Sequence, residues 1–100
     1  MTTRLEDLSA ASFEPHTGSE FTVESGDVVV ALRLESVRLL GHRRPDATRD
    51  PFSLTFVGPK GLRLPQGISQ FCREGFGVAG IFITQTGDGA RGSEFEAVFT

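Results

Sequence analysis

The sequence predicts a small, mainly β protein: a six-stranded antiparallel barrel or sandwich with one or two short helices at its N-terminus. Beyond residue 20, apolar residues alternate with polar ones, which is the period of a half-buried strand. Short turns rich in Gly, Pro and Asp separate the alternating runs. No amphipathic helix lies between any two runs. Because parallel strands would need such a crossover, we expect every pairing to be antiparallel.

The length and composition indicate one soluble globular domain. We assign residues 1–100 to this domain, with a helical cap at 1–18 and an antiparallel β body at 20–100. Hydrophobic residues make up 38% of the chain and charged residues 23%, which is ordinary for such a domain. The chain contains nine Phe residues and no Tyr or Trp, so its Phe, Tyr and Trp inventory carries no polar group. We therefore expect most of them to fill the core.

Two short helical turns are expected in the cap. Thr2 or Thr3 can cap the first and Ser9 the second, because their side chains accept hydrogen bonds from the free N–H groups at a helix start. Pro15 keeps the second turn short, and it should end before Gly18.

The β body is expected to contain six strands. They read EFTVES, VVVALRLESVRLL, FSLTFV, ISQFCRE, VAGIFITQT and EFEAVFT, at residues 20–25, 28–40, 52–57, 68–74, 78–86 and 94–100. In the second of these strands, the apolar residues of one face have even numbers as far as Leu34 and odd numbers from Val37. A β-bulge should therefore lie near Glu35–Ser36. The terminal strand is expected at a sheet edge, where a strand from another chain can pair with it.

The segment GDGARG, residues 87–92, has the G-x-G-x-x-G spacing of a dinucleotide-binding loop. That loop works between a strand and a helix whose N-terminus holds the pyrophosphate. Only SEFEAVFT follows, and it alternates like a strand. We therefore interpret the glycines as a hairpin loop. Asp88 is the single carboxylate within it, which leaves a calcium loop unsupported.

The sequence predicts no catalytic, metal or cofactor site. His16 and His42 are the only histidines and have no metal-ligand spacing, and Cys72 is the only cysteine. No G-x-S-x-G motif is present. We therefore expect a protein that is not an enzyme; the enzymatic alternative would have to use His42 or Cys72. Cys72 itself either faces outward or is a small buried residue.

Charge and hydropathy also limit the partners. The net charge of −3 argues against nucleic acid, whose binding depends on Lys and Arg. The start of the chain, MTTRLEDLSAASFEP, lacks the apolar core of a signal peptide, and no apolar run is long enough to cross a membrane. We expect a cytoplasmic protein without a membrane partner, and leave export as part of an assembly open.

Six residues are candidates for contact with a partner. Phe82 is out of phase with its neighbours and is exposed if its strand is covered on one face only. Phe76 is the second expected exposed aromatic. Arg43 and Arg44 belong to the charged segment GHRRPDATRDP, which is either an anion or partner contact or a solvated loop. The other two, Leu64 and Gln66, lie in LPQG, which is either a recognition loop or a structural corner whose Gln side chain ties it down.

The segments PFSLTFVGP, LPQGISQF, GFGVAGIFITQ and EFEAVFT, with LSAASFEPHTGSEFTV before them, resemble a family of small bacterial proteins described only as a domain of unknown function. The resemblance covers most of the chain apart from GHRRPDATRD. Ser69, Arg73 and Gln85 stand where the family usually has an aromatic residue, His and Pro, which puts the local packing in doubt. The resemblance implies no activity. It implies only that such proteins accompany phage-tail-collar-like fibre proteins in bacterial gene clusters.

These observations predict a non-enzymatic interaction or assembly module that contacts another protein or itself. The alternative is a binding protein for a small apolar or anionic ligand, held in the barrel mouth near LPQG and HRRP. Six strands leave little room for such a ligand.

Overall fold

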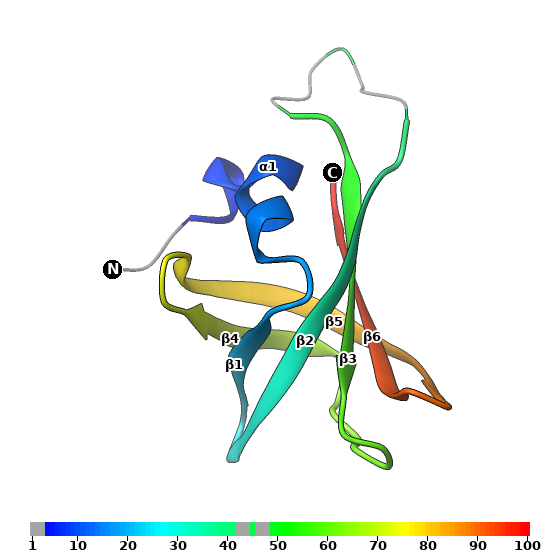
Figure 1. Cartoon of the computed structure of the whole chain (residues 1–100). Coiled ribbons are helices and arrows are strands. Elements are labelled where there is room, and N and C mark those ends of the chain that lie inside the picture. The colour runs from blue at the N-terminus through cyan, green and yellow to red at the C-terminus, as the bar shows by residue number, and fades with distance from the viewer. Residues whose placement is uncertain (1–3, 42–44, 46–48) are drawn as a thin grey trace.

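The chain forms a closed antiparallel barrel with short helical segments beside it (Figure 1). The computed structural model describes residues 4–41, 45 and 49–100. The helical segments are η1 (Leu5–Asp7), α1 (Ala10–Phe13) and η2 (Glu14–His16); the strands are β1 (Glu20–Ser25), β2 (Val28–Leu39), β3 (Phe52–Gly58), β4 (Gly67–Arg73), β5 (Gly77–Gly89) and β6 (Gly92–Phe99). The strand order is β1-β2-β3-β6-β5-β4, and β4 pairs again with β1. The predicted fold class is confirmed, as a barrel rather than a sandwich.

Closure of the barrel places the terminal strand β6 between two others. It pairs with β3 from Ser93 to Phe99 and with β5 from Gly92 to Glu96. The expectation that this strand lies at a sheet edge is therefore wrong. The sequence pattern of a strand is the same at an edge and inside a barrel, because alternation reports the two faces and not the two sides.

Two bulges help the sheet to close. In β2 the register shifts between Leu34 and Ser36, so Leu34 pairs with Phe56 and Ser36 with Thr55. This confirms the bulge that the change of apolar phase predicts. A second shift, between Gln85 and Gly87 of β5, was not predicted. Bulges increase local twist and bend a strand, which lets six short strands curl into a closed barrel.

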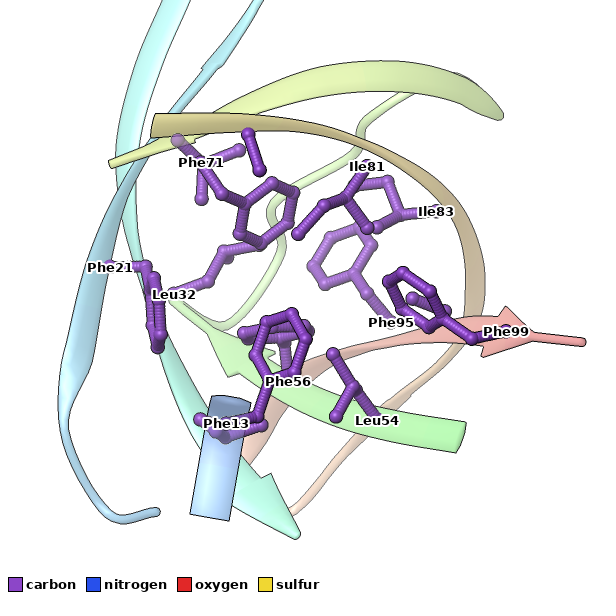
Figure 2. Close-up of a cluster of buried hydrophobic side chains, with 14 of the residues drawn as sticks. Phe13, Phe21, Leu32, Leu54, Phe56, Phe71, Ile81, Ile83, Phe95 and Phe99 are labelled. Atoms are coloured by element: carbon purple, nitrogen blue, oxygen red, sulfur yellow. The ribbon is translucent and has the colours of Figure 1, made fainter. Parts of the chain in front are cut away.

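Phenylalanine fills the interior (Figure 2). Phe52 and Phe99 stack with their ring centroids 4.6 Å apart, and Phe13 of α1 lies against both. The other buried rings are Phe21, Phe56, Phe71 and Phe95, interleaved with Leu32, Leu54, Ile81 and Ile83. The helical cap is thus part of the core, because one of its side chains completes the aromatic cluster.

Arg49 holds the helical segments against one end of the barrel. Its Nη1 donates to the backbone oxygen of Leu8 at 2.7 Å and also to that of Leu5. Its guanidinium carbon lies 5.2 Å from the centroid of the Phe99 ring, a cation–π contact. The expected cap at Ser9 is confirmed as the start of α1, while Thr2 and Thr3 lie outside the described residues.

Candidate functional site

The outward surface of Ile68–Cys72 in β4 and of Val78–Thr84 in β5 is uncharged, and we call it the β4–β5 face. Its seven outward residues are Ile68, Gln70, Cys72, Val78, Gly80, Phe82 and Thr84. Charged residues make up 23% of the chain, so an uncharged stretch across two strands stands out. A neutral face of this kind has a low cost of desolvation on contact with another surface.

Phe82 and Ile68 form the apolar centre of this face. They are direct cross-strand partners, and their exposed fractions are 50% and 66%. Gly80 lies next to this pair on the same face, directly across from Gln70, and has no side chain. A Cβ there would stand 3.2 Å from Cγ2 of Ile68 and 3.3 Å from Nε2 of Gln70, so both neighbours lean across the glycine. The expectation that Phe82 is exposed is confirmed.

Sequence reasoning missed Ile68, although its signal is present in the strand. Ile68 shares the phase of Gln70 and Cys72 and is opposite in phase to the buried Phe71. An aliphatic residue in the polar phase of a strand is exposed by the same argument that exposes Phe82. The structure also places Cys72 outward, which resolves its two possible positions.

Two of the candidate partner residues have structural positions instead. Phe76 is only partly exposed, because its ring lies 5.1 Å from that of Phe13 and 5.2 Å from that of Phe21. Leu64 is 6% exposed and belongs to the core. The expectation that Phe76 is an exposed aromatic is therefore wrong, and the Leu64 side chain is not available on the surface of this structure.

The remaining candidates are not brought together. Gln66 is exposed beyond the buried Leu64, and it is not the side chain that ties this loop down. Arg43 and Arg44, together with His42, lie outside the described residues.

Gln85 of β5 is the residue that holds the LPQG loop. Its Oε1 accepts from the backbone N–H of Leu64 at 3.1 Å, and its Nε2 donates to the backbone oxygen of Leu62 at 2.8 Å. The Oγ of Ser93 also lies 2.8 Å from the Leu62 oxygen. The loop thus covers the barrel end opposite the helical segments, where Figure 1 shows it at the lower end. LPQG is a structural corner in this fold.

We expect Gln85→Leu to lower the free energy of unfolding by about 1–3 kcal/mol, because it leaves the partly buried N–H of Leu64 without a partner and leaves the Leu62 oxygen with Ser93 alone. Urea unfolding of the wild type and the variant would measure the loss. Gln70→Leu makes the same chemical change on the outer face and should cost less than about 0.5 kcal/mol. Equal losses in the two variants would contradict the role given to Gln85.

The other two departures from the family pattern also have structural explanations. Arg73, at the end of β4, donates from Nη1 to the backbone oxygen of Glu20 at 2.8 Å and from Nε to Nδ1 of His16 at 3.3 Å. These two bonds join the end of β4 to η2 and to the start of β1. Ser69 lies in the core with its Oγ unpartnered. A larger aromatic side chain at this position would contact the same interior.

A groove of about 420 Å³ lies beside α1 at the helical end of the barrel. Ala10 and Glu14 line one side, and Leu39, Arg49 and Asp50 line the other. Arg49 already donates to two backbone oxygens and stacks on aromatic rings, so its charge is used to hold the cap. The groove thus lies where the helical segments pack against the barrel. We identify no catalytic or ligand-binding arrangement among its described side chains.

The glycine segment forms the hairpin between β5 and β6, as expected. Arg91 at its tip forms an ion pair with Glu35, and Arg33 donates to the same carboxylate at 2.9 Å. The hydrogen bond from Arg33, together with the charge of Arg91, holds the pKa of Glu35 below its usual value. This pair fixes the hairpin to the bulge of β2, so the segment has a structural explanation and no helix follows it.

The described part of the chain holds no group of three or more His, Cys, Asp and Glu side chains placed to bind a metal. Among those same residues, no helix combines the length and the apolarity needed to cross a bilayer. Cys72 is an exposed free thiol on the β4–β5 face. This face, with the exposed apolar pair Ile68 and Phe82 at its centre, is the candidate site.

Comparison with known proteins places the chain in one family. No curated protein matches it, and no solved structure does. The sequence from 8 to 99 matches the family described as Domain of unknown function (DUF6916). This match spans α1, η2 and the whole barrel, including every strand around the β4–β5 face. The chain is therefore a member of the DUF6916 domain family.

Proposed function

We propose that this protein is a non-enzymatic interaction module that docks another protein on its β4–β5 face. The observation that carries the proposal is the pair Ile68 and Phe82, two large apolar side chains that lie side by side and are at least half exposed. Holding such groups in water is unfavourable, and contact with a partner removes that cost.

The packed interior supports a role in docking over a role in enclosing a small ligand. Phenylalanine rings fill the barrel, the helical segments cover one end, and the loop with Leu64 covers the other. A ligand in the barrel mouth would have to displace these side chains. An interaction through the outer face requires no rearrangement of the core.

The finer proposal is that the partner belongs to a fibre or a phage-tail-like assembly. It is supported by the resemblance to bacterial proteins that accompany phage-tail-collar-like proteins. An accessory module with a rigid barrel and one neutral face suits docking onto a larger protein, because a rigid surface loses little entropy on binding.

Phe82→Asp is expected to abolish stoichiometric capture of the partner while the barrel stays folded. The variant places a charge at the centre of the contact, and binding would have to bury it unpaired. The measurement is capture by the tagged protein from a lysate of the source organism, with quantitative mass spectrometry. Circular dichroism and thermal unfolding verify the fold of each variant.

Leu39→Asp is the matched control for this experiment. Leu39 is 60% exposed, but it lies beside the groove at the helical end and not on the β4–β5 face. It should leave capture unchanged. Loss of the partner with Leu39→Asp and retention with Phe82→Asp would move the site to that groove and reject the β4–β5 face.

A further inference from the structure

We infer that the partner docked on the β4–β5 face is a different protein whose own contact surface has an apolar centre flanked by Lys or Arg, and not a second copy of this chain. The inference rests on the proposed docking function and adds the chemistry of the partner.

Carboxylates flank the neutral face on both of its sides. On one side, Glu24 of β1 lies directly across from Gln70 of β4. On the other, Glu96 of β6 lies directly across from Thr84 of β5. Both are outward and exposed. We call Glu24 and Glu96 the acidic rim.

No basic side chain of the described residues forms an ion pair with this rim. The four strands that carry the face and its rim contain one basic residue, Arg73, whose guanidinium is bonded to His16 and to a backbone oxygen at the end of the barrel. The face therefore presents apolar groups at its centre and unpaired negative charge at its borders.

A second copy of the chain is disfavoured by this arrangement. A two-fold contact places the same patch on both subunits. Glu24 lies level with Gln70 and Gly80, whereas Glu96 lies level with Thr84 four residues further along β5, so the two carboxylates occupy diagonally opposite corners of the face. A second copy brings the same two carboxylates and no free basic side chain from these four strands. No two-fold arrangement of this face therefore pairs opposite charges at the rim, which disfavours such a contact.

A partner whose contact surface carries Lys or Arg at its border places an opposite charge against both Glu24 and Glu96. Rim charges of opposite sign steer the approach of the two proteins and fix their orientation, and the apolar centre supplies the burial. Because the carboxylates are exposed, their contribution is screened by salt, so the complex should weaken as ionic strength rises.

The test reverses the rim without changing the centre. Glu24→Lys combined with Glu96→Lys should weaken binding of the protein captured by the wild type by about tenfold or more at low salt. Asp27→Lys combined with Glu14→Lys makes the same change in net charge at exposed positions away from the face, and should change binding less than about twofold. Affinities are measured by titration at two salt concentrations, and sedimentation of the wild type alone measures self-association.

A further readout uses the single cysteine. Cys72 lies on the β4–β5 face and is exposed, so bound partner should slow its reaction with a thiol reagent. Slower labelling in the wild-type complex, and normal labelling in the rim-reversed variant at the same concentrations, is the expected result.

The outcomes separate this inference from the proposed function. If Phe82→Asp removes the partner but the rim reversal has no effect or strengthens binding, docking stands and the basic-rim partner is rejected. If the wild type forms a dimer that Phe82→Asp dissociates, a second copy is the occupant and the inference fails. If no partner depends on Phe82, both the docking function and the inference built on it are rejected.

Discussion

Phe13→Ala is expected to lower the free energy of unfolding by about 3–5 kcal/mol, the usual cost of deleting a buried phenylalanine. Phe13 is fully buried, and its ring lies 5.7 Å from that of Phe99 and 5.9 Å from that of Phe52. Domains of this size have a total stability of about 5–15 kcal/mol, so the variant should be close to unfolded at physiological temperature. Urea unfolding at 25 °C would measure the loss.

Ala11→Ser provides the control on the same helix. Ala11 is exposed, and its substitution should cost less than about 0.5 kcal/mol. A loss below about 1 kcal/mol for Phe13→Ala would mean that the helical cap is an appendage and that the barrel core closes without it. The large loss is expected because α1 is too short to be stable alone, and its only buried side chain is the one that joins it to the barrel.

Local patterns in the sequence predict the strands of this fold and one of its bulges. Alternation reports which side chains are buried, so it locates the strands, and the change of phase after Leu34 locates the first bulge. The second bulge lies in β5, where Gln85, Thr86 and Gly87 give no apolar residues from which a change of phase can be read. The signal is present only where the bulge interrupts an apolar series.

No local sequence pattern predicts that the barrel closes. It depends on pairing between β1 and β4 and between β3 and β6, segments far apart along the chain. The same holds for Arg49, whose partners Leu5 and Leu8 precede it by more than forty residues. Long-range contacts decide whether strand β6 has a free side, and this is why its expected edge position was wrong.

In the candidate site, too, residues whose exposure follows from strand phase were predictable, and residues whose burial depends on long-range contacts were not. Phe82 was found because its phase within one strand predicts exposure, and Ile68 has the same signal. Phe76 and Leu64 lie in connections, where no phase exists, and long-range packing against Phe13 or the loop bonds of Gln85 determine their burial. The acidic rim appears only when β1 and β6 are placed on either side of β4 and β5, which needs the strand order.

The glycines of the hairpin at residues 87–92 are expected to differ sharply in their tolerance of alanine. Gly92→Ala should cost more than about 3 kcal/mol, because two separate penalties add. Gly92 has a φ of +135°, which side chains rarely adopt, and a Cβ there would overlap the backbone oxygen of Gly58. Neither the oxygen of a paired strand nor the hairpin can move aside cheaply.

Gly87→Ala is the matched control in the same segment. A Cβ at Gly87 meets nothing within 4 Å, so alanine should be neutral or should stabilise the protein by up to about 1 kcal/mol through a less flexible unfolded chain. Gly89→Ala should fall between the two, since its Cβ would stand 2.6 Å from Oε2 of Glu94, the end of a side chain that can rotate away. Thermal and urea unfolding of the three variants would establish the order.

A loop built to bind a dinucleotide needs the first glycine for its tight turn, whereas a hairpin with this geometry needs the last one. A large loss at Gly87 with tolerance at Gly92 would therefore contradict the structural role assigned to these glycines.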